Sequence, residues 1–135
     1  MEEAEVNSVD LFNCHATSTP KGDASEAACI KKVVQGKNEH AFITANKGNI
    51  GHMVAGAALT ESIFAIKAFE TDIIPAIKNL GADQWSCRQC MDDEPIFNGL
   101  NYVQENCKSE INTIVKNSLC FGGINMSVVF KKLSK

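Results

Sequence analysis

The chain has 135 residues, of which 44% are hydrophobic and 21% are charged. This length suits one domain, and the composition allows a buried core, which excludes an intrinsically disordered chain. The net charge is −3 and the lysines and arginines form no basic stripe, so nucleic acid is not an expected partner.

Two strand–loop–helix units are predicted in the first half of the chain. Residues 9–12 form an apolar run typical of a short buried strand, and a turn follows at 20–23. Residues 23–26 resemble a capping box, so a helix is expected to begin there and to end at Gly36. Residues 41–44 form a second buried strand. Strands that alternate with helices predict parallel pairing and an α/β fold.

A second helix is expected over residues 53–69, which are apolar on nearly every side. A helix of this kind normally lies inside a protein rather than on its surface. The segment is long enough to raise the question of a membrane span, but Glu61 and Lys67 lie within it, and charges are costly in lipid. We therefore predict a core helix and no membrane span.

Shorter strands and a hairpin are expected after residue 70. Residues 73–77 are extended but interrupted by proline, which favours an edge strand. Residues 81–100 are polar and typical of a surface loop, and a short strand fits 100–103. Strands at 113–118 and 126–130 flank a Gly-Gly turn and form a hairpin. The last strand is apolar enough to be predicted as a central one.

The cysteines favour free thiols. Met1 is followed by acidic residues and not by an apolar signal segment, so we expect a protein that is not secreted and has no disulfides. Cys87 and Cys90 form the one CxxC pair of the sequence. Besides these, only Cys107 and Cys120 remain as candidate zinc ligands, and both are isolated, so no metal site is expected.

Two loops carry the candidate functional residues. His15 follows the first strand, and Lys47 and His52 lie between the second strand and the long helix. Loops held by a rigid scaffold are frequent places for chemistry, whereas His40 fits a solvated surface position. Lys47 and Glu61 are predicted to form a buried ion pair. Such a pair is costly unless well satisfied, and it therefore marks a functional site.

Three motifs resemble those of the β-ketoacyl-[acyl-carrier-protein] synthases. Residues 13–23, NCHATSTPKGD, resemble the NAHxTSTPxGD motif of that family; residues 47–52, KGNIGH, match its KxxxGH motif; and residues 117–125, NSLCFGGIN, resemble its NSFGFGGTN motif. The order is the family's own, and the motifs cover most of the chain. The resemblance is to the C-terminal domain of the elongating condensing enzymes. It implies the C-terminal half of a thiolase-like α/β fold, with a mixed sheet, strand–loop–helix units and a C-terminal hairpin.

The resemblance implies fatty acid chain elongation, in which a 3-oxoacyl-[acyl-carrier-protein] synthase, an acyltransferase, joins malonyl-[acyl carrier protein] to an acyl thioester by decarboxylative Claisen condensation. The resemblance implies no cofactor, because the substrates are carried on the phosphopantetheine of acyl carrier protein. Acyl carrier protein is therefore the expected partner. Because the resemblance is to the bacterial and mitochondrial type of enzyme, it implies a location in the cytoplasm or the mitochondrial matrix. The alternatives are a non-catalytic acyl-binding or carrier-protein-binding fragment or paralogue, and a polyketide-type condensing domain.

The resemblance also assigns residues to the decarboxylation half of the site. His15 and His52 correspond to the two histidines that hydrogen-bond the malonyl thioester carbonyl, so their rings are expected to lie within several ångströms of each other. Donors held in a dry pocket stabilise the negative charge that decarboxylation builds on that oxygen. Lys47 pairs with Glu61 and orders the site, and its charge favours neutral imidazoles.

Further assignments concern substrate binding and the nucleophile. Phe121 corresponds to a gating phenylalanine whose backbone N–H forms half of an oxyanion hole, and Thr17 and Thr19 correspond to residues that hold the pantetheine arm. The family's nucleophilic cysteine lies in an N-terminal domain to which nothing in residues 1–135 corresponds. Cys14 is expected to face the core, since adjacent strand residues point to opposite faces, and Cys120 replaces a glycine of the gating loop. We therefore expect a single C-terminal domain over 1–135 that does not condense substrates alone, that exposes an apolar face to its missing half, and that belongs to a homodimeric full-length enzyme.

Overall fold

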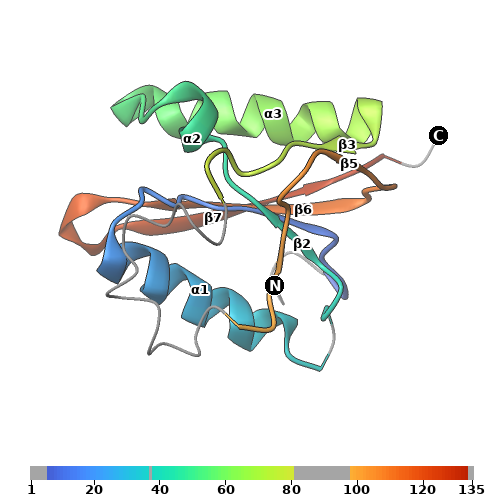
Figure 1. The fold of residues 1–135 in the computed structure, drawn as a ribbon, viewed down its shortest axis with the longest axis horizontal. Helices are drawn as coiled ribbons and strands as arrows, with labels where there is room; N and C mark the ends of the chain where they lie inside the picture. The colour runs from blue at the N-terminus through green and yellow to red at the C-terminus, as the bar shows by residue number, and fades with distance from the viewer. Residues whose placement is uncertain (1–5, 37, 81–97, 134–135) are drawn as a thin grey trace.

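The computed structural model describes residues 6–36, 38–80 and 98–133, which form three layers (Figure 1). A mixed sheet lies in the middle. Helix α1 (Pro20–Val34) covers one face of it, and the one-turn helix α2 (Lys47–Ile50) and helix α3 (Ala57–Thr71) lie over the other. The surface loop predicted at 81–100 cannot be followed over 81–97, because these residues, with the CxxC pair, lie outside the described residues.

The parallel strands set the order of the sheet, which is β4-β2-β1-β6-β7 in the described residues. The central strand β1 (Leu11–Asn13) pairs in parallel with β2 (Phe42–Thr44) and with β6 (Thr113–Leu119). Strand β2 pairs in parallel with β4 (Asn101–Tyr102). The predicted α/β class and the parallel pairing are confirmed.

The C-terminal hairpin consists of β6, the 3₁₀ turn η2 (Phe121–Gly123) and the antiparallel strand β7 (Asn125–Lys131). The hairpin is confirmed, but the prediction of a central last strand is wrong, because β7 lies at the edge of the described sheet. One side of β6 is already paired with β1, so its hairpin partner can bind only on the outer side. A separate two-stranded sheet joins β3 (Ile73–Ile74) to β5 (Cys107–Lys108).

Helix α1 begins at Pro20, three positions earlier than predicted. Proline at the first helical position is favourable, because its fixed φ suits a helix and its missing N–H would have no intrahelical partner there. The N-cap residue Thr19 makes no side-chain capping bond. The capping-box prediction is therefore wrong, and Asp23 lies in the first turn. The helix ends just before Gly36, as predicted.

Helix α3, preceded by the 3₁₀ turn η1 (Val54–Gly56), buries one face and exposes the other. Its buried residues recur at helical spacing and are mostly small: Ala57, Glu61, Ala65 and Ala68. The larger residues Leu59, Ile63 and Ile66 point outward and are 71%, 53% and 44% exposed. The prediction of a core helix is thus wrong for the described residues, since α3 packs on the sheet by one side only. No helix among these residues has the length and apolar character needed to cross a bilayer.

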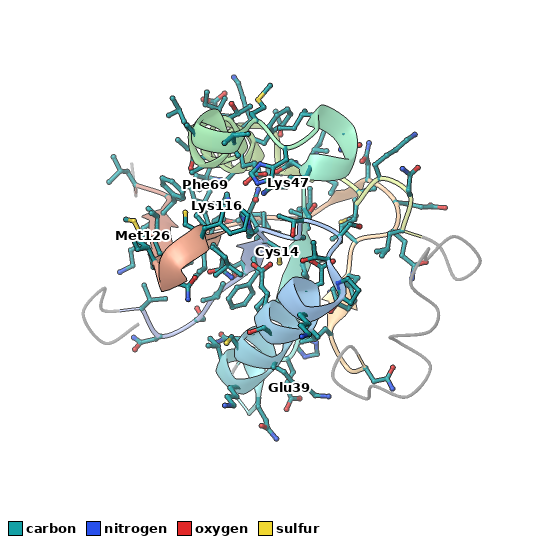
Figure 2. All side chains as sticks on the ribbon, turned by 90° about the vertical axis from the view of Figure 1, so that its left-hand side faces the viewer. Cys14, Glu39, Lys47, Phe69, Lys116 and Met126 are labelled. Atoms are coloured by element: carbon teal, nitrogen blue, oxygen red, sulfur yellow. The ribbon has the colours of Figure 1, made fainter. Side chains whose placement is uncertain are left out.

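Alternate residues of β1 point into different cores. Leu11 packs with residues of α3, whereas Phe12 and Cys14 pack with Ile30 of α1. Figure 2 shows Cys14 between the sheet and α1, with Lys47 and Lys116 on the side of α3. This alternation places the polar end of β1 beneath α2 and α3.

Candidate active site

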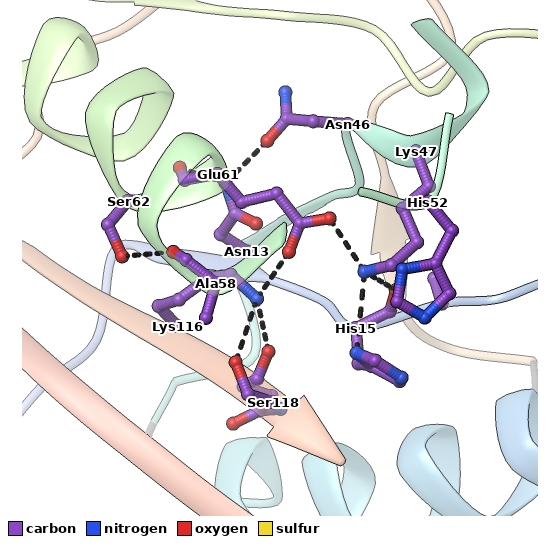
Figure 3. Close-up of polar contacts among 12 residues, drawn as sticks. Asn13, His15, Asn46, Lys47, His52, Ala58, Glu61, Ser62, Lys116 and Ser118 are labelled. Atoms are coloured by element: carbon purple, nitrogen blue, oxygen red, sulfur yellow. Dashed lines mark hydrogen bonds and ion pairs between the residues drawn. The ribbon is translucent and has the colours of Figure 1, made fainter. Parts of the chain in front are cut away.

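The two predicted loops meet at one edge of the sheet. β1 and β2 are parallel neighbours, so the segments after their carboxyl ends lie side by side. The first segment carries His15, and the second carries Lys47 and His52. The two imidazole rings stand edge to face with centroids 5.5 Å apart (Figure 3). The prediction that the histidines converge is confirmed.

Lys47 ties the first histidine to α3. Its ammonium lies 2.6 Å from Glu61 Oε1, and the two side chains are 6% and 1% exposed. The predicted buried ion pair is therefore confirmed. Lys47 Nζ also donates to the backbone carbonyl of His15 at 2.5 Å and lies 3.3 Å from His15 Nδ1. An ammonium can only donate, so His15 Nδ1 accepts and the ring proton is on Nε2.

His52 has the same tautomer through a different contact. The backbone N–H of Val54 donates to His52 Nδ1 at 3.1 Å, which leaves the ring proton on Nε2. For His15, burial and then the charge of Lys47 lower the pKa below its ordinary value, which agrees with the expected neutral ring. The site therefore presents two Nε2–H donors close together.

Glu26 holds the loop that carries His15, and the sequence analysis did not identify it. Its two carboxylate oxygens accept the backbone N–H groups of His15 and Ala16, each at 2.9 Å. The Asn117 side chain donates to Glu26 Oε1 at 3.1 Å. Glu26 stands four positions before Ile30 on the buried face of α1, and this spacing is a signal of a buried carboxylate.

Lys116 is a second site residue that the sequence analysis missed. Its ammonium lies 2.7 Å from Glu61 Oε2, and both side chains are 1% exposed. Its burial could have been inferred from the sequence, because Lys116 stands two positions after Ile114 in a strand and side chains two positions apart share a face. Nearby, Asn13 donates to Asn46 Oδ1 at 2.7 Å and so joins the ends of β1 and β2.

Two glycines permit the turn between Lys47 and His52. A Cβ at Gly48 would lie 2.8 Å from the backbone oxygen of Lys78, closer than real Cβ atoms approach such an atom. Gly51 has φ +76°, a conformation that side chains disfavour. Both residues are therefore needed to bring the lysine and the histidine to the same place.

The remaining predicted residues lie outside the contacts of the histidine pair. Thr17 and Thr19 are on the loop between β1 and α1, with their hydroxyl oxygens 3.1 Å apart. Phe121 is fully exposed on the hairpin turn. Cys14 is buried on the side of α1, as predicted, and burial followed by the charge of Glu26 raises the pKa of its thiol. Such a thiol is a poor nucleophile. Among the described residues, no group of three or more histidines, cysteines or carboxylates could bind a metal ion.

Sequence comparisons agree with this geometry. A family model described as β-ketoacyl synthase, C-terminal domain, matches residues 1–81. The chain is 34% identical over 125 residues to 3-oxoacyl-[acyl-carrier-protein] synthase 1 of Escherichia coli, a match that covers 93% of this chain and 28% of that protein. It is 34% identical over 133 residues to the mitochondrial 3-oxoacyl-[acyl-carrier-protein] synthase of Arabidopsis thaliana, covering 94% of this chain and 26% of that protein.

Solved structures show the same fold. A type II polyketide synthase acyl carrier protein in complex with its ketosynthase aligns with a TM-score of 0.79 and 25% identity, over 93% of this chain and 28% of that one. A β-ketoacyl synthase from Burkholderia phymatum aligns with a TM-score of 0.77 and 24% identity, over 98% of this chain and 30% of that one. The predicted thiolase-like fold is confirmed, and the chain spans less than a third of the length of these relatives.

Proposed function

Because the chain belongs to the β-ketoacyl synthase family, C-terminal domain, we propose that it supplies the decarboxylation half of a 3-oxoacyl-[acyl-carrier-protein] synthase site. The reaction is fatty acid chain elongation by decarboxylative Claisen condensation, an acyltransferase reaction. One observation carries the proposal: His15 and His52 lie with ring centroids 5.5 Å apart, and each has its proton on Nε2. Two donors so arranged suit one thioester carbonyl oxygen.

The proposed chemistry uses these donors on a developing oxyanion. When the bond between the malonyl α-carbon and its carboxylate breaks, carbon dioxide leaves and the electron pair passes into an enolate. His15 and His52 donate to the oxygen on which negative charge develops as the bond breaks, so they stabilise the transition state more than the bound substrate. The enolate carbon then attacks the carbonyl carbon of the acyl thioester, the acyl C–S bond breaks, and the thiolate that carried the acyl group leaves. Lys47 and Glu26 fix the ring and the backbone of His15, respectively.

The acyl substrates and partner follow from the same proposal. The substrates are carried on the phosphopantetheine of acyl carrier protein, with Thr17 and Thr19 at the pantetheine arm, and no further cofactor takes part. Phe121 acts as the gate, and its backbone N–H donates to the oxyanion of the acyl thioester. The related complex of a carrier protein with its ketosynthase supports this partner. The acyl-accepting thiolate comes from a domain outside residues 1–135, in a homodimeric enzyme of the cytoplasm or mitochondrial matrix.

A fatty acid substrate is favoured over a polyketide. Relatives named 3-oxoacyl-[acyl-carrier-protein] synthase are 34% identical over 93% and 94% of this chain, which supports a fatty acid substrate. The two classes share the chemistry of the histidine pair, so the preference rests on these identities.

Release of labelled carbon dioxide from malonyl-[acyl carrier protein] tests the proposal. In the enzyme that contains this chain, His15→Ala and His52→Ala are each expected to slow decarboxylation by about 10²–10³-fold, the usual cost of one lost oxyanion donor. His40→Ala is the matched control, because His40 is exposed on a turn, and it should leave the rate unchanged. Unchanged decarboxylation in both site variants, with carrier-protein binding retained, would instead indicate a binding module.

A further inference from the structure

Glu61 lies between two buried ammonium groups rather than one. Its Oε1 is 2.6 Å from Lys47 Nζ, and its Oε2 is 2.7 Å from Lys116 Nζ (Figure 3). The Glu61 and Lys116 side chains are each only 1% exposed. Lys47 and Glu61 already form a neutral pair, so Lys116 adds a second buried positive charge. It faces the carboxylate oxygen that Lys47 does not bind, and this oxygen accepts no hydrogen bond among the described residues, so the contact is an ion pair.

Lys116 also binds the strand that leads to the hairpin turn. Its ammonium donates to the backbone oxygen of Asn117 and lies 3.5 Å from Ser118 Oγ. Both residues are in β6, three or four positions before Phe121. One ammonium therefore joins α3, which carries Glu61, to the strand that enters the turn.

We infer that Lys116 is a positioning residue of the histidine site: it holds Glu61 by its second oxygen and thereby fixes Lys47 against His15. The chain of contacts runs from Lys116 to Glu61 at 2.7 Å, from Glu61 to Lys47 at 2.6 Å, and from Lys47 to the His15 carbonyl at 2.5 Å. The two links made by Lys47 are charge-assisted hydrogen bonds, which are strong and directional, and the link made by Lys116 is a buried ion pair. Lys116 itself touches neither histidine ring in these contacts. It holds the site through Glu61, and its charge also lowers the pKa of His15 across space.

The three charges add up to one net positive charge beside His15. Without Lys116, the Lys47–Glu61 pair would be neutral, and protonation of His15 would meet less repulsion. The other charged or titratable groups that face His15 are Glu26 of α1 and His52. Neither of them makes a hydrogen bond or ion pair with Lys116 among the described contacts. The pKa of His15 therefore responds to the charge of Lys116 and to the positions of Lys47 and Glu61 that Lys116 fixes.

The experiment is an NMR titration of the histidine rings in the 135-residue chain. Lys116→Met keeps an unbranched side chain of similar length but removes the charge, and it is expected to raise the pKa of His15. Lys116→Arg keeps the charge, and it is expected to leave the pKa of His15 close to the wild-type value. Lys132→Met is the matched control, since Lys132 is 36% exposed and lies 3.5 Å from Asp72, away from the histidines. It removes the same charge and should not change the titration of His15.

A folded Lys116→Met chain in which His15 titrates as in the wild type would overturn the inference, because a side chain that only fills space would leave that pKa unchanged. Should Lys116→Met fail to fold, the wild-type chain gives a second test. Its Lys116 ammonium protons are expected to exchange slowly and to show nuclear Overhauser contacts to the Glu61 side chain, and rapid exchange without these contacts would also overturn it. The inference rests on the proposed function only in naming the site. Neither measurement uses a substrate, so its failure is distinguishable from a failure of the decarboxylation assay.

Discussion

At the residue scale, neighbouring residues at the end of β1 have different structural roles. Asn13 points toward α3 and joins Asn46, and Cys14 packs in the core beneath α1. His15 then leaves the strand, with its backbone held by Glu26 and its ring beside Lys47. The pleat of the strand therefore separates the inert thiol from the imidazole, although the two residues are adjacent in sequence.

Removing the charge of Glu61 should destabilise the chain strongly. In Glu61→Gln, two buried ammonium groups would lose their shared counter-charge, and breaking a buried pair from one side typically costs about 3–5 kcal/mol of unfolding free energy. Glu70→Gln is the control, because Glu70 and Lys67 form an exposed pair worth about 0–1 kcal/mol. Urea unfolding of the two variants measures the difference. Equal losses in both would contradict a buried, shared carboxylate.

The lowered pKa of His15 predicts a stability that depends on pH. In the unfolded chain a histidine has a pKa of about 6.5, so between the folded and unfolded values the unfolded chain binds more protons. The contribution of His15 is therefore fully present above about pH 6.5 and is lost as the pH falls from there toward the folded pKa. His15→Gln should flatten this slope in urea midpoints measured from neutral to mildly acidic pH. His40→Gln should keep it, and a slope unaffected by His15→Gln would refute the assignment.

At the scale of elements, the turn that links α2 to α3 has an unusual backbone. Val54, at the start of η1, has φ +50°, which is a rare conformation for a β-branched residue. Its backbone N–H is the group that binds His52 Nδ1. A residue held in a disfavoured conformation beside a reactive side chain is consistent with strain kept for function.

Val54→Gly should therefore stabilise the chain. A left-handed conformation costs a residue with a side chain roughly 1–2 kcal/mol, whereas glycine adds roughly 0.5–1 kcal/mol of unfolded-state entropy. Val54 is 79% exposed, so little packing is lost, and the net gain in unfolding free energy should be about 0.5–1 kcal/mol. Val33→Gly, at a 37% exposed position within α1, should lose about 1 kcal/mol. Thermal or urea unfolding separates the two, and a loss in Val54→Gly as large as in Val33→Gly would show that the turn is not strained.

At the scale of the whole molecule, the charged network faces inward and large apolar side chains face outward. The outer side of α3 exposes Leu59, Ile63 and Ile66, and the edge strand β7 exposes Met126 and Val128. Exposed apolar side chains of this size favour association when they gather in a patch. The expectation that the chain would expose an apolar face agrees with this arrangement.

The isolated 135-residue chain should therefore self-associate. Light scattering should show a mass that rises with concentration. The double variant Leu59→Glu/Ile63→Lys keeps the net charge and adds a favourable i,i+4 pair on α3, and it should shift the chain toward the monomer with its helix content unchanged. Val33→Lys on α1, on the other face of the sheet, should leave the association as in the wild type. A monomeric wild-type chain at high concentration would contradict the prediction.

Short sequence patterns were enough to predict several features of the fold and of the site. Strand runs, helical spacing and the Gly-Gly turn located the two strand–loop–helix units and the hairpin. The motif resemblance predicted that His15 meets His52, and local pattern predicted the Lys47–Glu61 pair and the burial of Cys14. These features depend on alternation within one strand or on neighbouring loops at one sheet edge, and both can be read from short stretches of chain.

Long-range packing decided the rest. Glu26 meets Asn117, 91 positions away, and Lys116 meets Glu61 across the layers of the fold, so neither role can be seen in a local window. The edge position of β7 follows from which side of β6 is free, and the outward face of α3 follows from how much of the helix the sheet covers. Local periodicity shows that a residue is apolar or charged, but the partner that satisfies it is chosen only when distant segments pack together.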